Sequence, residues 1–73
     1  MTVYETALIY FDLVAAEEKI PDEEHQAKEH INALRTKYHE LLMVKMREEG
    51  IDFSDRFDAA QKAFEVVRSR VAD

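Results

Sequence analysis

Residues 22–49 read DEEHQAKEHINALRTKYHELLMVKMREE, and the rest of the chain is expected to pack along this segment. Its apolar residues recur at alternating steps of four and three: Ala27, Ile31, Leu34, Tyr38 and Leu41. That spacing places them on one stripe of an α-helix, with charged residues around the rest of the circumference. At 1.5 Å per residue such a helix would be about 42 Å long, which makes it the longest element of the molecule.

Boundary signals flank this segment on both sides. Ile20-Pro21 predicts a turn before it, because proline disfavours helical backbone in the preceding residue and is tolerated in the first turn of a helix. Gly50, the single glycine of the chain, can take the left-handed conformation that ends many helices. Glu48 and Glu49 lie at the negative end of the helix dipole, and the sequence supplies no structural reason for them.

An N-terminal helix over about residues 2–19 is predicted by a capping box, in which Thr2 and Glu5 each satisfy a free backbone N–H of the first turn. One broad apolar face of this helix should pack against residues 22–49. A second apolar stripe follows the opposite side and comprises Thr6, Ile9, Leu13 and Ala16. Either the bundle itself or a second subunit could cover that stripe. We favour a subunit contact because 73 residues offer few other elements to cover it.

The C-terminal part of the long helix is apolar almost all the way round, since residues 41–46 read LLMVKM. In a bundle with short turns, an N-terminal helix about 27 Å long would end level with Tyr38 or His39. One side of residues 41–46 is then left without a partner in the same chain. We therefore assign further contacts with a second subunit to this end of the helix: Leu42, Met43, Val44 and Met46. A shifted N-terminal helix that covers the same side chains is the alternative.

A third helix over about residues 54–72 carries the most regular pattern of the chain. Its apolar residues follow steps of four and three: Phe53, Phe57, Ala60, Phe64, Val67 and Val71. Such a heptad seam suits a helix that lies alongside another at about 20°. We expect Phe57 and Phe64 to anchor the core. The predicted fold is all-α: residues 1–73 form one domain, a small antiparallel, up-down-up three-helix bundle with one long central helix, which forms a homodimer.

Composition narrows the classes of function. Sixteen acidic and ten basic residues give a formal net charge of −6, which disfavours direct binding to nucleic acid or to an anionic membrane because both require a basic face. No apolar run of the sequence reaches the roughly 18 residues that a membrane-spanning helix needs. The chain has no cysteine and begins without the basic segment of a secretory signal. We expect a cytoplasmic protein without disulfides.

The titratable residues form no recognisable catalytic or metal-binding motif. His25 and His30 are five residues apart, about 140° around a helix, so they do not present a ligand pair on one face. His39-Glu40 begins like a zinc-protease motif, but Met43 stands where the second histidine is needed. We expect all three histidines to be solvated. The sequence therefore predicts no enzyme, no catalytic residue, no cofactor, no metal and no small-molecule substrate.

Surplus apolar surface on two helices leads to a hypothesis of function. We expect a small protein–protein interaction module, such as an adaptor, an assembly subunit or a chaperone-like protein, that acts as a homodimer and offers a helical groove to an unidentified protein partner. The alternative is an acidic inhibitor that mimics nucleic acid and blocks the basic cleft of a DNA- or RNA-binding protein. Binding by such a mimic should weaken steeply with salt, and binding in a groove much less.

Overall fold

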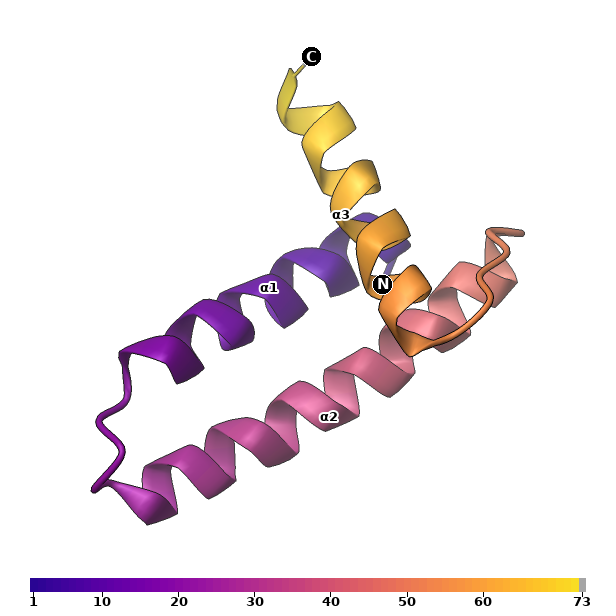
Figure 1. The fold of residues 1–73 in the computed structure, drawn as a ribbon. Helices are drawn as coiled ribbons and strands as arrows, with labels where there is room; N and C mark the ends of the chain where they lie inside the picture. The colour runs from indigo at the N-terminus through magenta and orange to yellow at the C-terminus, as the bar shows by residue number, and fades with distance from the viewer. Residues whose placement is uncertain (73) are drawn as a thin grey trace.

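The computed structural model describes residues 1–72, and three α-helices without any strand make up this part of the chain (Figure 1). Helix α1 spans Val3–Lys19, α2 spans His25–Glu48 and α3 spans Arg56–Ala72. The prediction of an all-α fold with three helices and a long central one is confirmed. Asp73, the last residue of the predicted domain, lies outside the described residues.

The starts of α1 and α2 follow the local chemistry of the sequence. At α1, the Glu5 N–H donates to Thr2 Oγ1 at 3.1 Å and the Thr2 N–H donates to Glu5 Oε1 at 3.0 Å, which is the predicted capping box. Helix α2 begins at His25, later than predicted. The reason is a turn from Pro21 to Glu24, in which the Glu24 N–H donates to the Pro21 carbonyl oxygen at 3.0 Å.

The end of α2 and the start of α3 are also determined by residues close to them in the sequence. Gly50 has a φ of 74°, and the Ile51 N–H donates to the Met46 carbonyl oxygen at 2.9 Å, the hydrogen bond of a Schellman motif. The predicted helix-ending role of Gly50 is thereby confirmed. Helix α3 begins later than predicted because Asp55 caps it: the Asp58 N–H donates to Asp55 Oδ1 at 2.8 Å.

Helices α1 and α2 form an antiparallel hairpin, and α3 joins it at one end (Figure 1). The buried core lies at this end: Val3, Ala7 and Tyr10 of α1, Leu42 and Met46 of α2, and Ala59 and Ala63 of α3. Nearer its turn the hairpin is linked by an ion pair between Glu17 and Arg35 at 3.2 Å. The core is therefore small and lies to one side of the molecule.

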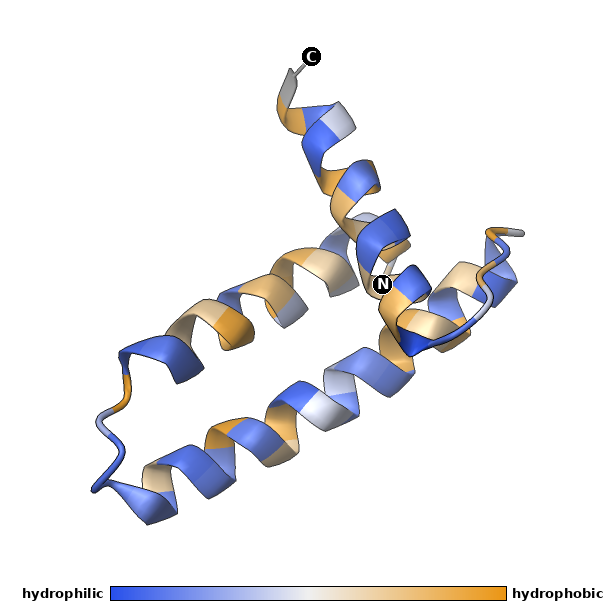
Figure 2. Cartoon of the chain, in the orientation of Figure 1, coloured by the Kyte–Doolittle hydropathy of each residue, from blue (hydrophilic) through white to orange (hydrophobic). Residues whose placement is uncertain are grey.

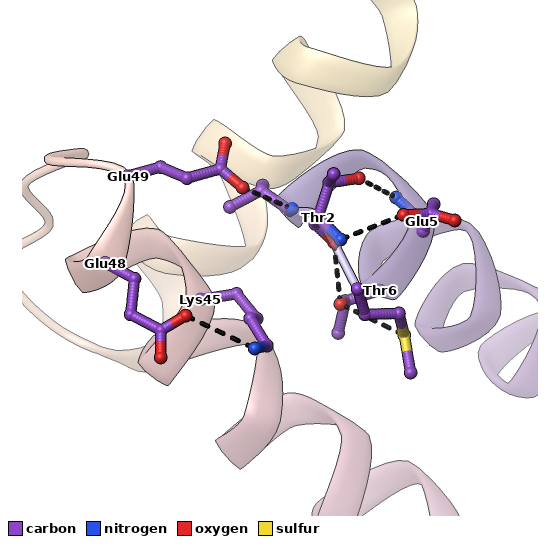
Figure 3. A network of polar contacts seen from close by, with 8 residues as sticks. Thr2, Glu5, Thr6, Lys45, Glu48 and Glu49 are labelled. Carbon is purple, nitrogen blue, oxygen red and sulfur yellow. Dashed lines mark hydrogen bonds and ion pairs between the residues drawn. The ribbon is translucent and has the colours of Figure 1, made fainter.

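Glu49 links the end of α2 to the start of α1. Its Oε2 accepts a hydrogen bond of 2.8 Å from the Val3 N–H, one of the free donors in the first turn of α1 (Figure 3). The carboxylate thereby lies at the positive end of the α1 dipole. Its neighbour Glu48 forms an exposed ion pair with Lys45 at 3.2 Å. The contact with Val3 supplies the reason for Glu49 that the sequence alone does not give.

Helix α3 crosses the start of α1 instead of lying along the hairpin, and its C-terminal turns project past α1 (Figure 1). Ala59 and Ala63, one turn apart, are fully buried at the crossing, where small side chains let two helices approach closely. Phe57 is 83% exposed and Phe64 is 51% exposed. The prediction that these phenylalanines anchor the core is wrong, because the buried face of α3 lies about 130° around the helix from them.

Candidate interaction surface

Three large apolar side chains of α3 form a line along its surface. Phe57, Phe64 and Val71 are 83%, 51% and 74% exposed. They are spaced seven residues apart, so they lie within about 40° of one another around the helix and extend over about 21 Å. The half-buried Ala60 and Val67 border this line. We call these five residues the α3 stripe; Figure 2 shows apolar segments that recur along α3 as far as its last turns.

A shallow groove runs beside the α3 stripe where α3 crosses α1. It has a volume of about 580 Å³, with an apolar lining of Phe11, Ala60 and Phe64 and with Asp58 and Glu65 among its polar residues. The rings of Phe11 and Phe64 meet edge to face, with their centroids 5.7 Å apart. The same chain therefore covers one edge of Phe64, and half of that side chain stays open to solvent.

Two further contacts hold α3 in this orientation. The Arg70 guanidinium lies 4.6 Å from the centroid of the Tyr4 ring, within the range of a cation–π interaction. Near the start of α3, His39 Nε2 lies 3.2 Å from the Arg56 carbonyl oxygen. Together with the buried alanines, these contacts fix the rotation of α3 about its own axis. That rotation leaves Phe57, Phe64 and Val71 of the α3 stripe largely exposed.

His39 is a buried structural link between α2 and α3. Burial lowers the pKa of its imidazole, and the positive charge of Arg56 lowers it further, so the ring is neutral near pH 7. With the proton on Nε2, the ring donates to the Arg56 carbonyl oxygen, and no described residue donates to the buried Nδ1. The expectation that His39 is solvated is wrong. His25 and His30 are exposed, as expected.

The structure separates the predicted interface residues into two groups. Thr6, Leu42 and Met46 are fully buried in the core of the same chain, and the Thr6 hydroxyl donates to the Thr2 carbonyl oxygen at 2.8 Å. This burial removes all three from the predicted contact surface. The physical reason is that α1 starts level with the end of α2, as the bond to Glu49 requires, and α3 packs against both helices there.

The other predicted residues stay at least partly open: Ile9, Leu13, Ala16 and Met43 are half-buried, and Val44 is 45% exposed. We call Ile9, Leu13 and Ala16 the α1 stripe. It lies about 140–160° around α1 from Phe11, whose ring contacts α3, so it faces away from α3. The α3 stripe, which the heptad pattern assigned to the core, is a second and more exposed apolar surface.

Charge is distributed unevenly over the elements. One basic and four acidic residues give residues 3–19 a net charge of −3, and residues 20–24 and 49–55 each contain three acidic residues and no basic one. Helix α3 has four basic and two acidic residues and a net charge of +2: Arg56, Lys62, Arg68, Arg70, Asp58 and Glu65. The α3 stripe therefore lies on a basic helix within a chain of net charge −6.

Within residues 1–72, no three His, Asp or Glu side chains come together as a metal site. In the same part of the chain, every helix is too short or too polar to cross a membrane. Comparison of the chain with protein-family models, with curated proteins and with solved structures finds no match.

Proposed function

We propose that the protein is a non-enzymatic helical interaction module that acts as a homodimer and also contacts a different protein. The observation that carries this proposal is the α3 stripe, where Phe57, Phe64 and Val71 are 83%, 51% and 74% exposed. In this proposal the chain keeps the predicted up-down-up order, with α3 crossed over the hairpin. It works in the cytoplasm, a compartment that suits a chain without cysteine.

Burial of the α3 stripe supplies the driving force for association. A large apolar side chain gains about 1.5–3 kcal/mol when it moves from full exposure to a buried site. Two copies that cover one another's stripe side chains gain this amount several times over, before the cost of association is subtracted. That gain is large beside the stability of a domain with so small a core.

The α1 stripe offers a second surface for a different protein. Its residues Ile9, Leu13 and Ala16 are half-buried, so a partner helix could cover their remaining exposed area. Helix α1 has a net charge of −3 and α3 one of +2, so a second copy of the same helix would be repelled more strongly at α1 than at α3. We therefore assign this face to a partner of different sequence, and the α3 stripe to the homodimer.

An acidic mimic of nucleic acid is the second candidate function. The negative charge of α1 and of the two connections supports it. The basic helix α3 interrupts that negative surface, so the interaction module has the stronger support. Salt separates the two: binding of the mimic to a basic cleft should fall steeply as ionic strength rises, whereas association through the α3 stripe should persist.

Sedimentation equilibrium tests the homodimer. Between about 1 and 100 μM we expect a monomer–dimer equilibrium of the 8.6-kDa chain. The variant Phe57→Gln/Val71→Gln should raise the dissociation constant at least about tenfold, because it removes two apolar contacts. Leu8→Gln is the matched control and should leave the dissociation constant unchanged, because Leu8 is 37% exposed but lies outside both stripes. A wild-type chain that stays monomeric at about 100 μM contradicts the proposal.

A further inference from the structure

The α3 stripe has polar neighbours of both signs along its outer flank. In chain order these are Asp58, Gln61, Glu65 and Arg68, and within the chain Asp58 forms an ion pair with Lys62 at 3.2 Å and Glu65 one with Arg68 at 3.2 Å. They lie about 20–100° around the helix from Phe57. The opposite flank faces the hairpin of the same chain, since Ala63 is buried there and Arg70 lies over Tyr4. Asp58, Gln61 and Glu65 also line the shallow groove beside Phe11, so a helix that packs on the stripe from outside meets the outer flank at this groove.

The order of these charges favours a second copy of α3 that runs in the opposite direction. When two α3 helices run in opposite directions and are aligned at residue 63, Arg68 of one copy lies beside Asp58 of the other, and Glu65 lies beside Gln61. Both pairings occur twice about a twofold axis near residue 63, as a symmetric dimer requires. A parallel pair would instead bring the outer flank of one copy against the opposite flank of the other, which already faces its own hairpin.

The same reversal also sets which apolar side chains meet. Phe57 would lie between Val67 and Val71 of the second copy, and Phe64 would lie level with both Ala60 and Phe64 of the second copy. The phenylalanine at each end of the pair then packs on valines, and the two Phe64 rings meet near the twofold axis, where aromatic rings attract one another in edge-to-face or offset arrangements. In the structure, Phe57 and Val71 are the most open members of the stripe, at 83% and 74% exposure, so both ends are free to pair.

We propose that the homodimer forms by antiparallel packing of two α3 helices along the α3 stripe. This inference rests on the proposed homodimer and assigns its surface and its direction. Each copy keeps Ala59 and Ala63 packed on its own hairpin, so the dimer consists of two hairpins joined by a central pair of α3 helices. The C-terminal turns of α3 project past α1 (Figure 1).

Single-cysteine variants test the direction of packing, because the chain has no cysteine of its own. Phe57→Cys and Val71→Cys chains are mixed at a dimerising concentration, oxidised in air and separated on a non-reducing gel. We expect the mixed 57–71 disulfide to exceed either self-linked product at least about fivefold. In an antiparallel pair, identical positions lie about 18–24 Å apart along the axis, beyond the reach of a disulfide.

Ser69→Cys is the matched control for Val71→Cys. Ser69 is exposed in the same turn of α3 but lies about 160° around the helix from Val71. Mixed with Phe57→Cys, it should give little product. A self-linked Val71→Cys product in place of the mixed one would overturn the inference, because it requires parallel packing. A Val71→Cys chain that links to Leu13→Cys would also overturn it, because α3 would then lie on the α1 stripe.

A self-linked Val71→Cys product, or a disulfide between Val71→Cys and Leu13→Cys, would leave the homodimer itself intact. A wild-type chain that is monomeric by sedimentation would instead overturn the homodimer and this inference together.

Charge reversal provides an independent test. Arg68→Glu should raise the dissociation constant about three- to tenfold, because it places two carboxylates together. Lys37→Glu makes the same change of charge at an exposed position of α2, and it should alter the dissociation constant less than about twofold. Equal effects would overturn the assignment of the flank.

Discussion

Helices α1 and α3 each contain 17 residues and each carries an apolar face, yet only α1 covers that face within the chain. Helix α1 buries Val3, Ala7 and Tyr10, as its pattern predicts. Helix α3 buries the small Ala59 and Ala63 and exposes Phe57. A regular apolar pattern thus identifies a face that needs a partner, but it does not identify the partner.

The two helices also differ in how they are held. The start of α1 is fixed by its capping box and by the hydrogen bond from Val3 to Glu49. Helix α3 is held by two buried alanines, by the contact of His39 with the Arg56 carbonyl oxygen, and by aromatic contacts at its edges. We expect substitutions at the α1–α2 junction to affect folding, and substitutions on the α3 stripe to affect association.

The largest difference in unfolding free energy should come from truncation of one apolar side chain in the α1–α2 junction and one on the α3 stripe. Leu42→Ala should lower the free energy of unfolding by about 2–5 kcal/mol, because Leu42 is fully buried. Phe57→Ala should lower it by less than about 0.5 kcal/mol in dilute, monomeric protein, because Phe57 is 83% exposed. Urea unfolding measures both. Equal losses would show that Phe57 is a core residue, as the heptad pattern suggests.

An intermediate effect is expected at the link between α2 and α1. Glu49→Ala should cost about 1–2 kcal/mol of unfolding free energy, because the Val3 N–H loses a charged acceptor. Glu48→Ala is the matched control and should cost less than about 0.5 kcal/mol, since the ion pair of Glu48 with Lys45 is exposed. Chemical denaturation of both variants checks this. A similar, small cost for the two would mean that Glu49 does not hold α1 in place.

The smallest effect should come from a change of pH, because a single ring is involved. The fold lowers the pKa of His39 from its ordinary value of 6.5, so the unfolded chain binds the proton more readily. Stability should be full above pH 6.5, fall as the pH drops below 6.5, and level off once the lowered pKa is passed. The charged and titratable groups near the ring are Arg35 and Glu40 of α2, Arg56 of α3 and Tyr10 of α1.

Thermal melting between about pH 8 and pH 5.5 measures this effect. A His39→Phe variant should lose the step that begins at 6.5, whereas His30→Phe, at an exposed position, should keep it. Persistence of the step in His39→Phe would show that another group titrates.

Local signals made much of the fold predictable from the sequence. The capping box at Thr2, the turn at Pro21 and the left-handed Gly50 each depend on residues within one helical turn, and all three occur where expected. The stripe along α2 and the broad face of α1 predicted the hairpin. Such signals fix where helices start and stop, and which faces are apolar.

Long-range geometry could not be predicted in the same way. The bond between Val3 and Glu49 joins residues 46 positions apart, and no local pattern announces it. The rotation of α3 depends on the close approach that Ala59 and Ala63 permit, whereas periodicity gives the larger Phe57 and Phe64 more weight. The same crossing buries Thr6, Leu42 and Met46 within the single chain, where the sequence predicts a contact surface.

Two-dimensional NMR of the wild-type chain over increasing concentration would show which surface is covered when copies associate. Between about 10 μM and 1 mM, the backbone signals of Phe57, Phe64 and Val71 should shift progressively, and those of the α1 stripe should stay unchanged. Concentration-dependent shifts at Ile9 and Leu13, with none along α3, would contradict the proposal that the α3 stripe is where two copies meet.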